Sequence, residues 1–355
     1  MSEAILLVGG RGTRLRPLTL TTPKPLLPVA GVPVTVHQIE RARDAGVTRV
    51  VLGTSYRAEV FAERLGDGRD LGVEIAYAVE DEPLGTGGAI RNAAELLTCA
   101  PGDPVMVLNG DVLSGVDYAA LVEGHVSSGA ALTLHLTRVA DPTAYGLVPT
   151  DGDGRVLAFR EKPQTPEEIV TDQINAGCYV FTRAVIGEIP AGRPVSVERE
   201  TFPDLLARGR VVRGVVDDAY WLDLGTPWDF VRGSCDLVLG VAPWRGHEPA
   251  DSLVQTGAQV DDAAVIGGGT TVGHDARILG DAVVEGSVLL DGCVVEAGAR
   301  VMGSVIGAGA RVRGGATVVD SVVGDGAVVE AGNELRHGAR LWPGVVLPPT
   351  SVRFS

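Results

Sequence analysis

The first 240 residues alternate short apolar runs with segments of helical periodicity. The predicted strands are residues 4–8, 50–53, 73–79, 105–108 and 132–137. The predicted helices between them are residues 35–45, 59–64, 90–97 and 118–127. Strands separated by helices indicate βαβ units, so we expect a Rossmann-like, mostly parallel sheet in an α/β domain covering residues 1–240. Ligands of such sheets bind at the carboxyl ends of the strands.

The hydrophobic pattern changes from residue 251 onward, where it becomes a short repeat. Aliphatic residues recur every six positions from Val254 to Leu290, and the series continues to Leu347 with three steps of five. Hexapeptide spacing is typical of a left-handed parallel β-helix, in which stacked coils bury a continuous aliphatic column. We therefore expect a β-helix domain over residues 251–355, with roughly five coils of about 18 residues each.

The overall charge excludes some classes of partner. Acidic residues number 45 and basic residues 30, which gives a formal net charge of −15. A nucleic-acid or anionic-membrane binder would instead present a basic surface. No stretch approaches the ~18 apolar residues of a membrane span. The four cysteines lie far apart without a CxxC pair, which favours reduced thiols in a cytoplasmic protein.

A glycine-rich segment with several cations follows the first predicted strand. Its basic side chains are Arg11, Arg14, Arg16 and Lys24. Backbone N–H groups of a glycine turn can approach phosphate oxygens, and nearby cations neutralise them. The dinucleotide fingerprint fails, because Leu15 stands where its third glycine belongs, and the P-loop pattern fails because neither lysine follows a glycine. The segment therefore predicts a site for a small polyanion that neither familiar motif describes.

The lysines are unusually few. Of the 30 basic side chains only Lys24 and Lys162 are lysines, and each precedes a proline. An ammonium group serves a phosphate as a compact point charge, whereas guanidinium imposes a planar fork. We expect both lysines to be functional.

The glycine-rich segment resembles the signature of the sugar-1-phosphate nucleotidyltransferases, also called nucleoside-diphosphate-sugar pyrophosphorylases. Further motifs follow in the order of that family, namely Asn109-Gly110-Asp111, Tyr145-Gly146, Glu161-Lys162-Pro163, Asn175-Ala176-Gly177 and residues 221–227. The hexapeptide tail and residues 196–203 resemble the mannose-1-phosphate guanylyltransferase branch of the family. The resemblance covers the whole chain.

The resemblance implies a role for each matching residue. The catalytic set is Arg14, Lys24, Asp111 and Asp223, and the two aspartates would hold Mg²⁺. The nucleotide-binding set is Val8, Gly9, Gly10, Gly12, Thr13, Arg14, Lys24, Glu80, Gly85, Thr86, Asn109 and Gly110. The sugar-phosphate set is Tyr145, Gly146, Glu161, Lys162, Asn175, Glu198 and Trp221. The implied reaction is in-line attack of a sugar 1-phosphate on the α-phosphorus of a nucleoside triphosphate, with release of pyrophosphate.

The base is predicted from one acidic side chain. Glu80 occupies the position where the thymidylyl and uridylyl enzymes of the family place a glutamine. An ionised carboxylate only accepts hydrogen bonds, so it suits N1–H and the N2 amine of guanine better than a pyrimidine carbonyl. We therefore expect GTP and mannose 1-phosphate as substrates and GDP-mannose as product. The alternatives are an exposed acid for Glu80, a core residue for Trp221, and cap or turn roles for Asp111 and Asp223.

Three other functions are also compatible with the sequence. The same reaction could use another triphosphate with glucose 1-phosphate or a cyclitol phosphate. The chain could instead be a non-catalytic regulatory subunit that binds a nucleotide sugar, although such a binder has no need of both aspartates. Acyl transfer through His274 or His337 is a third option, but the repeats contain almost no insertion that could build a pocket. We expect the repeats to pack against the first domain and to form a homo-oligomer.

Overall fold

The computed structural model describes residues 3–55 and 57–353. Contacts within the chain divide it into two compact units. Unit 1 combines the residues up to Gly10 with Thr35–Trp221, and unit 2 combines Arg11–Val34 with the chain from Leu222 onward. The glycine-rich segment is therefore split, and its part within unit 2, residues 11–24, is called the cation loop below.

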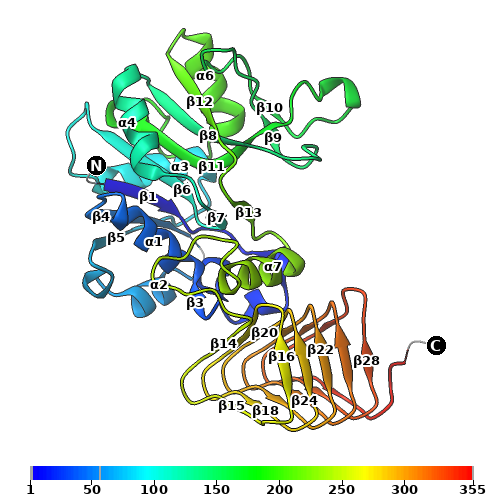
Figure 1. Ribbon diagram of the computed structural model, residues 1–355. Coiled ribbons are helices and arrows are strands. Elements are labelled where there is room, and N and C mark those ends of the chain that lie inside the picture. The colour runs from blue at the N-terminus through cyan, green and yellow to red at the C-terminus, as the bar shows by residue number, and fades with distance from the viewer. Residues whose placement is uncertain (1–2, 56, 354–355) are drawn as a thin grey trace. The chain divides into compact units, whose positions relative to one another are not determined.

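Unit 1 is built on a nine-stranded mixed sheet (Figure 1). Its strands are β1 (Glu3–Leu7), β4 (Arg49–Thr54), β5 (Glu74–Val79), β6 (Pro104–Asn109), β8 (Leu132–Arg138), β9 (Gly146–Leu147), β10 (Arg160–Glu161), β11 (Gln173–Thr182) and β12 (Val212–Val216). The order β6-β1-β4-β5 is parallel throughout, and β11 joins β6 antiparallel. Leu7 pairs with both Gly53 and Asn109, so the carboxyl ends of β1, β4 and β6 reach the same edge.

The helices of unit 1 cover this sheet. They are α1 (Val34–Asp44), α2 (Ala58–Leu65), α3 (Gly85–Ala93), α4 (Tyr118–Ser128), α5 (Arg183–Ile186) and α6 (Phe202–Ala207), with the short 3-10 helices η4 (Arg69–Leu71), η5 (Ala94–Leu96) and η6 (Pro166–Glu168) and the π-helix η7 (Val197–Thr201). Helix α3 packs against β1, β4 and β5, and α4 packs against β6, β8 and β11. The sequence prediction of the α/β fold is confirmed. The predicted helix 90–97 was placed too late, because α3 begins at Gly85 and its glycine-rich first turn reads as loop in the sequence.

Unit 2 contains the cation loop, one long helix and the repeats. The first part holds η1 (Thr13–Leu15), η2 (Leu18–Leu20), η3 (Lys24–Leu26), β2 (Pro28–Val29) and β3 (Val32–Pro33). Helix α7 (Pro227–Val238) begins at Thr226, whose Oγ1 accepts from the N–H of Asp229, and it packs against β2. Two short strands remain before the repeats. Strand β7 (Val112–Ser114) belongs to unit 1, and β13 (Trp221–Asp223) contains the point where the chain passes from unit 1 to unit 2.

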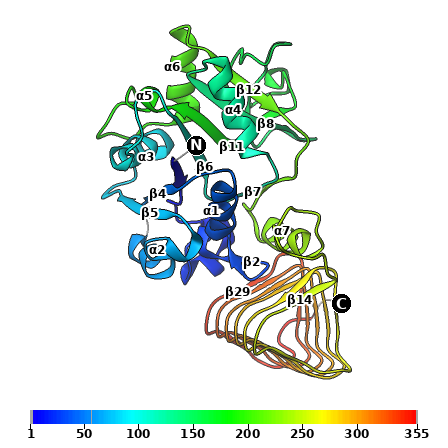
Figure 2. The same cartoon turned by 60° about the vertical axis from the view of Figure 1, so that its left-hand side comes forward.

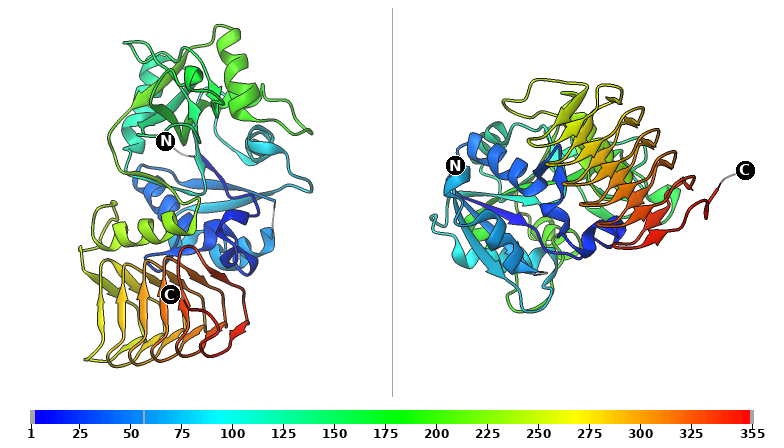
Figure 3. Two further views of the ribbon diagram at one scale, coloured as in Figure 1. Left: turned by 90° about the vertical axis from the view of Figure 1, so that its right-hand side faces the viewer. Right: turned by 90° about the horizontal axis from the view of Figure 1, so that it is seen from below.

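The repeats form the left-handed β-helix predicted from the hexapeptide spacing. Three parallel sheets of six, six and five strands make its faces, and in Figure 2 the coils outline a triangle. The strands are β14 (Ser252–Val254), β15 (Gln259–Val260), β16 (Val265–Gly267), β17 (Thr270–Val272), β18 (Arg277–Ile278), β19 (Val283–Glu285), β20 (Val288–Leu289), β21 (Val294–Val295), β22 (Arg300–Met302), β23 (Val305–Ile306), β24 (Arg311–Val312), β25 (Thr317–Val319), β26 (Val322–Val323), β27 (Val328–Val329), β28 (Glu334–Leu335), β29 (Arg340–Leu341) and β30 (Val346–Leu347). Figure 3 shows the successive coils stacked side by side in chain order.

The aliphatic column follows the predicted series with two corrections. Val254, its first predicted member, pairs in register with Val272 but is 44% exposed and lies outside the buried column. Leu289, and not Leu290, fills the column after Val284. The first five-residue step therefore lies at the same corner as the other two, which lead to Ile306 and Val323. At this corner a ladder of buried hydroxyls replaces the missing residue. Ser287 N donates to Thr270 Oγ1 at 3.2 Å, and the N–H groups of Ser304 and Ser321 each donate to the preceding serine Oγ at 3.1 Å.

The hydroxyl ladder makes a testable contribution to stability. Ser304→Ala leaves the N–H of Ser321 without its acceptor in a fully buried position, and an unsatisfied buried donor costs about 1–3 kcal/mol. We expect the free energy of unfolding of the β-helix to fall by this amount in urea titrations followed by circular dichroism. Ser351→Ala, at an exposed serine near the end of the β-helix, is the control and should change little. Equal stability of Ser304→Ala and the parent protein would show that the ladder contributes nothing.

Candidate active site

The first residues of the glycine-rich segment lie at the end of β1 in unit 1. Val8 continues the sheet, because its N–H donates to the carbonyl of Gly53 at 3.0 Å. A Cβ added at Gly9 would lie 2.9 Å from Ser55 Oγ, so a side chain would collide there. Gly10 has φ +114°, a conformation that L side chains rarely adopt. Gly9 and Gly10 are exposed, so a phosphate can approach their backbone at the strand end.

The cation loop of unit 2 is closed on itself. Gly12 has φ +55°, and a Cβ there would come within 3.0 Å of Lys24 Cβ. Thr19 Oγ1 donates to the carbonyl of Gly12 at 2.9 Å, and this bond holds the two ends of residues 12–19 together. Thr13 begins η1 directly after this glycine. The predicted residues Gly12 and Lys24 are therefore neighbours in space although the sequence separates them.

Three of the predicted catalytic residues meet in unit 2. Lys24 Nζ lies 3.7 Å from Asp223 Oδ1, and Arg14 Nη2 lies 4.0 Å from Asp223 Oδ2. The Lys24 side chain is only 11% exposed, whereas that of Arg14 is 67% exposed. Gly225 makes room for this arrangement, since a Cβ there would lie 3.0 Å from both terminal nitrogens of Arg14. The loop thus presents one shielded and one accessible cation beside a carboxylate.

The motif Asn109-Gly110-Asp111 lies at the carboxyl end of β6 in unit 1. Gly110 N donates to the carbonyl of Leu7 at 2.9 Å, and a Cβ at Gly110 would be 2.5 Å from that oxygen. Gly177, with φ +76°, packs on Asn109, where an added Cβ would be 2.8 Å from Nδ2. The motif is therefore wedged against β1, and Asp111 follows directly between β6 and β7.

Glu80 is buried rather than exposed. Its residue is 8% exposed, and its Oε2 accepts from the N–H of Leu84 at 2.9 Å. Burial raises the pKa of the Glu80 carboxyl, and the hydrogen bond from Leu84 opposes that rise. The alternative of an exposed acid is thus wrong. One carboxylate oxygen also shapes the turn that enters α3, which the sequence did not reveal.

The start of α3 joins two predicted sets of residues. Gly85 has φ +70°, and a Cβ there would lie 2.7 Å from the carbonyl of Val195. Thr86 Oγ1 donates to Glu198 Oε2 at 2.9 Å and accepts from the N–H of Val197 at 3.0 Å. A predicted nucleotide residue and a predicted sugar-phosphate residue are therefore directly hydrogen bonded. Val195 acts through its backbone, so its side chain gave no sequence signal.

Aromatic rings form one part of the sugar-phosphate set. Tyr145 and Trp221 meet edge to face with centroids 5.5 Å apart. Trp221 Nε1 donates to the carbonyl of Ala176 at 2.9 Å, which fixes the indole. Asn175 is committed to local structure, because Oδ1 accepts from Gly177 N at 3.0 Å and Nδ2 donates to the Tyr179 hydroxyl at 2.9 Å.

Lys162 occupies a strained position in the same set. It has φ +51° and precedes a proline, and its N–H donates to the carbonyl of Tyr145 at 3.1 Å. Its Nζ lies 3.9 Å from Glu161 Oε1, and the side chain is 58% exposed. Burial and the neighbouring Glu198 raise the pKa of Glu161, while Lys162 opposes the rise. Gly146 packs on Glu161, where an added Cβ would be 2.7 Å from Oε2.

The two aspartates have suitable chemistry for a divalent cation. Among residues 3–55 and 57–353 there is no cluster of three or more His, Cys, Asp or Glu side chains that could hold a metal alone. Mg²⁺ is bound by hard oxygen ligands and commonly uses one or two carboxylates together with waters and phosphates. Asp111 and Asp223 are carboxylates at strand ends, so their donor chemistry fits such an ion.

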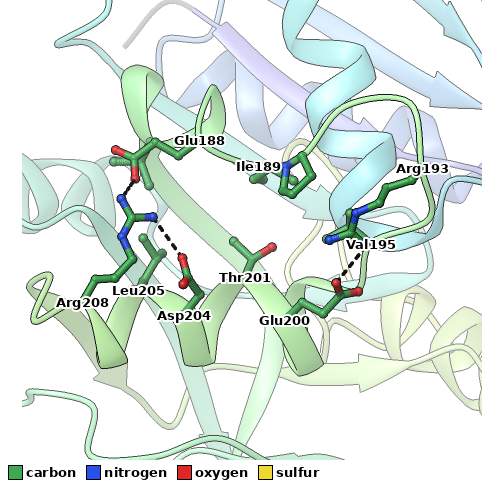
Figure 4. A pocket seen from close by; sticks show the side chains of 11 residues that line it. Glu188, Ile189, Arg193, Val195, Glu200, Thr201, Asp204, Leu205 and Arg208 are labelled. Atoms are coloured by element: carbon green, nitrogen blue, oxygen red, sulfur yellow. Dashed lines mark hydrogen bonds and ion pairs between the residues drawn. The ribbon is translucent and has the colours of Figure 1, made fainter.

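A separate cavity of about 290 Å³ lies between α5 and α6 in unit 1 (Figure 4). Its charged side chains are paired with one another. Arg208 bonds Glu188 at 2.6 Å and Asp204 at 3.0 Å, and Arg193 bonds Glu200 at 3.0 Å. None of the predicted site residues lines it, so it is not the candidate active site.

Comparison with known proteins agrees with the fold and the motifs. Residues 3–238 match the nucleotidyl transferase family, and residues 249–350 match the family described as GMPPB C-terminal domain. The chain is 57% identical to mannose-1-phosphate guanylyltransferase of Mycobacterium tuberculosis, covering 99% of this chain and 98% of that protein. It is 39% identical to probable mannose-1-phosphate guanylyltransferase 1 of Oryza sativa, covering 84% and 82%.

Solved structures resemble the first part of the chain. HddC from Yersinia pseudotuberculosis, complexed with GMP-PN, superposes with a TM-score of 0.56 at 29% identity, covering 67% of this chain and 100% of that one. The matched sequence families, the near full-length relative and the strand-end glycine loop lead to one conclusion: the chain belongs to the nucleotidyl transferase family.

Proposed function

We propose that this protein transfers a guanylyl group from GTP to mannose 1-phosphate, forming GDP-mannose and pyrophosphate. The observation that carries nucleotidyl transfer is the cluster of Arg14 and Lys24 around Asp223 at the glycine-rich loop. The choice of GTP and mannose 1-phosphate is supported by the names of the relatives from Mycobacterium tuberculosis and Oryza sativa.

The chemistry requires two anions to be brought together. A phosphate oxygen of mannose 1-phosphate forms a bond to the α-phosphorus of GTP, and the bond from that phosphorus to the β-phosphate bridging oxygen breaks. The phosphate is already a nucleophile, so no general base is needed, and the barrier is mainly positional and electrostatic. The residues proposed below therefore bind and neutralise charge.

We assign the cations to the two substrates. Arg14, whose side chain is accessible, holds the triphosphate and balances the charge that develops on pyrophosphate. Lys24, which is shielded, holds the α-phosphate region. Lys162, exposed on its strained turn, holds the phosphate of the sugar. We assign the remaining nucleotide contacts to Val8, Gly9, Gly10, Gly12, Thr13, Gly85, Thr86, Asn109 and Gly110.

Asp111 and Asp223 are the proposed holders of Mg²⁺. When bound, the ion neutralises phosphate charge and polarises a phosphoryl oxygen. Asp223 also keeps Arg14 and Lys24 near each other, so its carboxylate serves the protein whether or not the ion is present.

The sugar is placed in our proposal by the remaining predicted residues. Tyr145 and Trp221 supply ring surface, and Glu161 and Glu198 supply hydrogen-bonding oxygens. Asn175 supports the pocket through its bonds to Gly177 and Tyr179, and the second hydrogen of its Nδ2 is what it can offer to the sugar. Glu198 is already oriented, because Ser196 Oγ donates to its Oε2 at 2.8 Å. Gly146 keeps the approach beside Glu161 open.

The domain boundaries, the cellular location and the oligomeric state are also part of the proposal. We infer a nucleotidyltransferase domain over residues 1–240, a β-helix domain over 251–355, a cytoplasmic location and a homo-oligomer. The described part of the chain has no helix of the length and apolarity that a bilayer crossing demands. Exposed apolar side chains at the first and last coils, such as Val265 and Trp342, offer surface to a second copy.

The experiment that tests the proposed function is a matrix of four nucleoside triphosphates against several sugar 1-phosphates, with pyrophosphate release as the readout. We expect the GTP and mannose 1-phosphate pair to give the highest kcat/KM. High activity with another pair would keep nucleotidyl transfer and change the substrates. Nucleotide-sugar binding without pyrophosphate release from any pair would instead identify a regulatory subunit.

Glu80→Gln is expected to erode the preference for GTP over UTP and dTTP by about tenfold. A carboxylate that meets a pyrimidine carbonyl places acceptor against acceptor, and each unpaired polar group costs ~1–3 kcal/mol. Glutamine can still accept from Leu84 through its carbonyl and can turn its NH₂ toward a pyrimidine. The measurement is the ratio of kcat/KM values, with Glu82→Gln at an exposed position as the control. An unchanged ratio would remove Glu80 from base recognition.

A further inference from the structure

A residue in the last coils of the β-helix is hydrogen bonded to the backbone of the cation loop. Arg340, the first residue of β29, donates from Nη1 to the carbonyl of Arg14 at 2.9 Å and to that of Arg16 at 2.7 Å. These residues are 326 and 324 positions apart in the sequence. All three belong to unit 2, so the contact is internal to one compact body.

A second contact comes from the neighbouring coil. Thr21 Oγ1 donates to Asp325 Oδ2 at 2.6 Å. The other oxygen of Asp325 accepts from the N–H of Ala308 at 2.9 Å, which anchors the carboxylate in the β-helix. Arg340 pairs in register with Val322 of β26, close in sequence to Asp325, so adjacent coils hold the two ends of the loop segment 14–21.

The hydrogen bonds with Arg340 and Asp325 hold the loop and leave the Arg14 side chain accessible. The two carbonyls that Arg340 holds lie on either side of Leu15, whose side chain is buried. The loop also has a closure of its own, the hydrogen bond from Thr19 Oγ1 to the carbonyl of Gly12. Arg340 is therefore hydrogen bonded to the backbone of Arg14 itself, from which the guanidinium extends.

We propose that Arg340 is a positioning residue for nucleotidyl transfer, which sets Arg14 for the triphosphate and makes the β-helix part of the nucleotide site. The inference rests on the proposed function for its kinetic consequence. It predicts that the β-helix affects catalysis within a single chain, through the contact between Arg340 and the cation loop, in addition to any role in forming an oligomer.

The test compares full-length Arg340→Ala, Arg340→Lys and Arg300→Ala. Arg300 is the matched control, because it is the exposed first residue of β22 on a different face of the β-helix. We expect Arg340→Ala to lower kcat/KM for GTP about tenfold, equivalent to ~1.4 kcal/mol. The KM for mannose 1-phosphate and the thermal midpoint should stay near the parent values. Arg340→Lys should restore most activity, because one ammonium carries three hydrogens and can serve both carbonyls.

Hydrogen exchange supplies a readout that does not depend on activity. Backbone amides of residues 11–24 should exchange faster in Arg340→Ala than in the parent protein and Arg300→Ala. Parent-like kinetics and exchange in Arg340→Ala would overturn the inference, and so would an equal kinetic loss in Arg300→Ala. A parent protein inactive with every substrate pair would refute the proposed function instead, while the exchange comparison would still decide whether Arg340 holds the loop.

Discussion

Replacing Asp223 with asparagine is expected to lower kcat by about 10²–10³, the usual cost of losing one preorganised electrostatic group. Asparagine keeps the shape of the side chain but removes its charge. Lys24 at 3.7 Å and Arg14 at 4.0 Å then lose the carboxylate that they share. The proposed Mg²⁺ site loses one of its two hard ligands at the same time.

The measurement is pyrophosphate release at several magnesium concentrations. If Asp223 holds the ion, more magnesium is needed for half-maximal rate in the variant. Asp218→Asn, an exposed aspartate nearby in the sequence, controls for a general loss of charge and should keep parent activity. Parent-like turnover of Asp223→Asn with an unchanged thermal midpoint would show that this carboxylate serves neither the cations nor the metal.

Much of the fold could be predicted because periodicity reports burial directly. Apolar runs between helical segments predicted the parallel strands of unit 1, and the six-residue spacing predicted the β-helix. The boundary of α3 could not be predicted. Its first turn holds Gly85, Gly87 and Gly88, which have poor intrinsic helix propensity. The carbonyl of Val195 accepts from the N–H groups of Gly87 and Gly88, and this tertiary contact supports the turn.

The slip from Leu290 to Leu289 has a similar origin. Two adjacent leucines fit the hydrophobic period equally well, so spacing alone cannot choose between them. The choice depends on the hydroxyl ladder through Ser287, which shortens that corner by one residue. The ladder joins residues of successive coils, 17 positions apart, so the hydrophobic pattern of neighbouring residues does not predict it.

In the candidate site, too, local motifs could be read from the sequence, whereas contacts between distant residues could not. Motifs identified Arg14, Lys24 and Asp223 one by one, and the structure places these three together. Arg340 could not be identified from the sequence, because an arginine at the start of a repeat strand looks like the others in the tail. Its function depends on two carbonyls more than 300 residues away.

Lys24→Ala is expected to reduce kcat with GTP, and the loss in kcat should exceed that in Lys162→Ala. The ammonium is shielded and faces Asp223, and losing one partner of a buried charged contact typically costs ~2–5 kcal/mol. Lys24→Arg should not rescue fully, because a guanidinium is planar and larger and Gly12 already packs closely on this side chain.

Lys162→Ala is expected to have a different kinetic signature, with a raised KM for mannose 1-phosphate and a smaller change in kcat. Lys162 lies in unit 1, on the exposed turn beside Glu161, and our assignment gives it the phosphate of the sugar. Its strained backbone is held by the hydrogen bond to Tyr145, which the substitution leaves in place, so the turn should persist. Because the side chain is more than half exposed, solvent screens its charge, and the lost binding free energy should be ~2 kcal/mol, the low end of the range for charged contacts. Initial rates measured while each substrate is varied in turn separate the two lysines, with thermal midpoints to verify folding. Identical profiles for Lys24→Ala and Lys162→Ala would contradict the assignment of one lysine to each substrate.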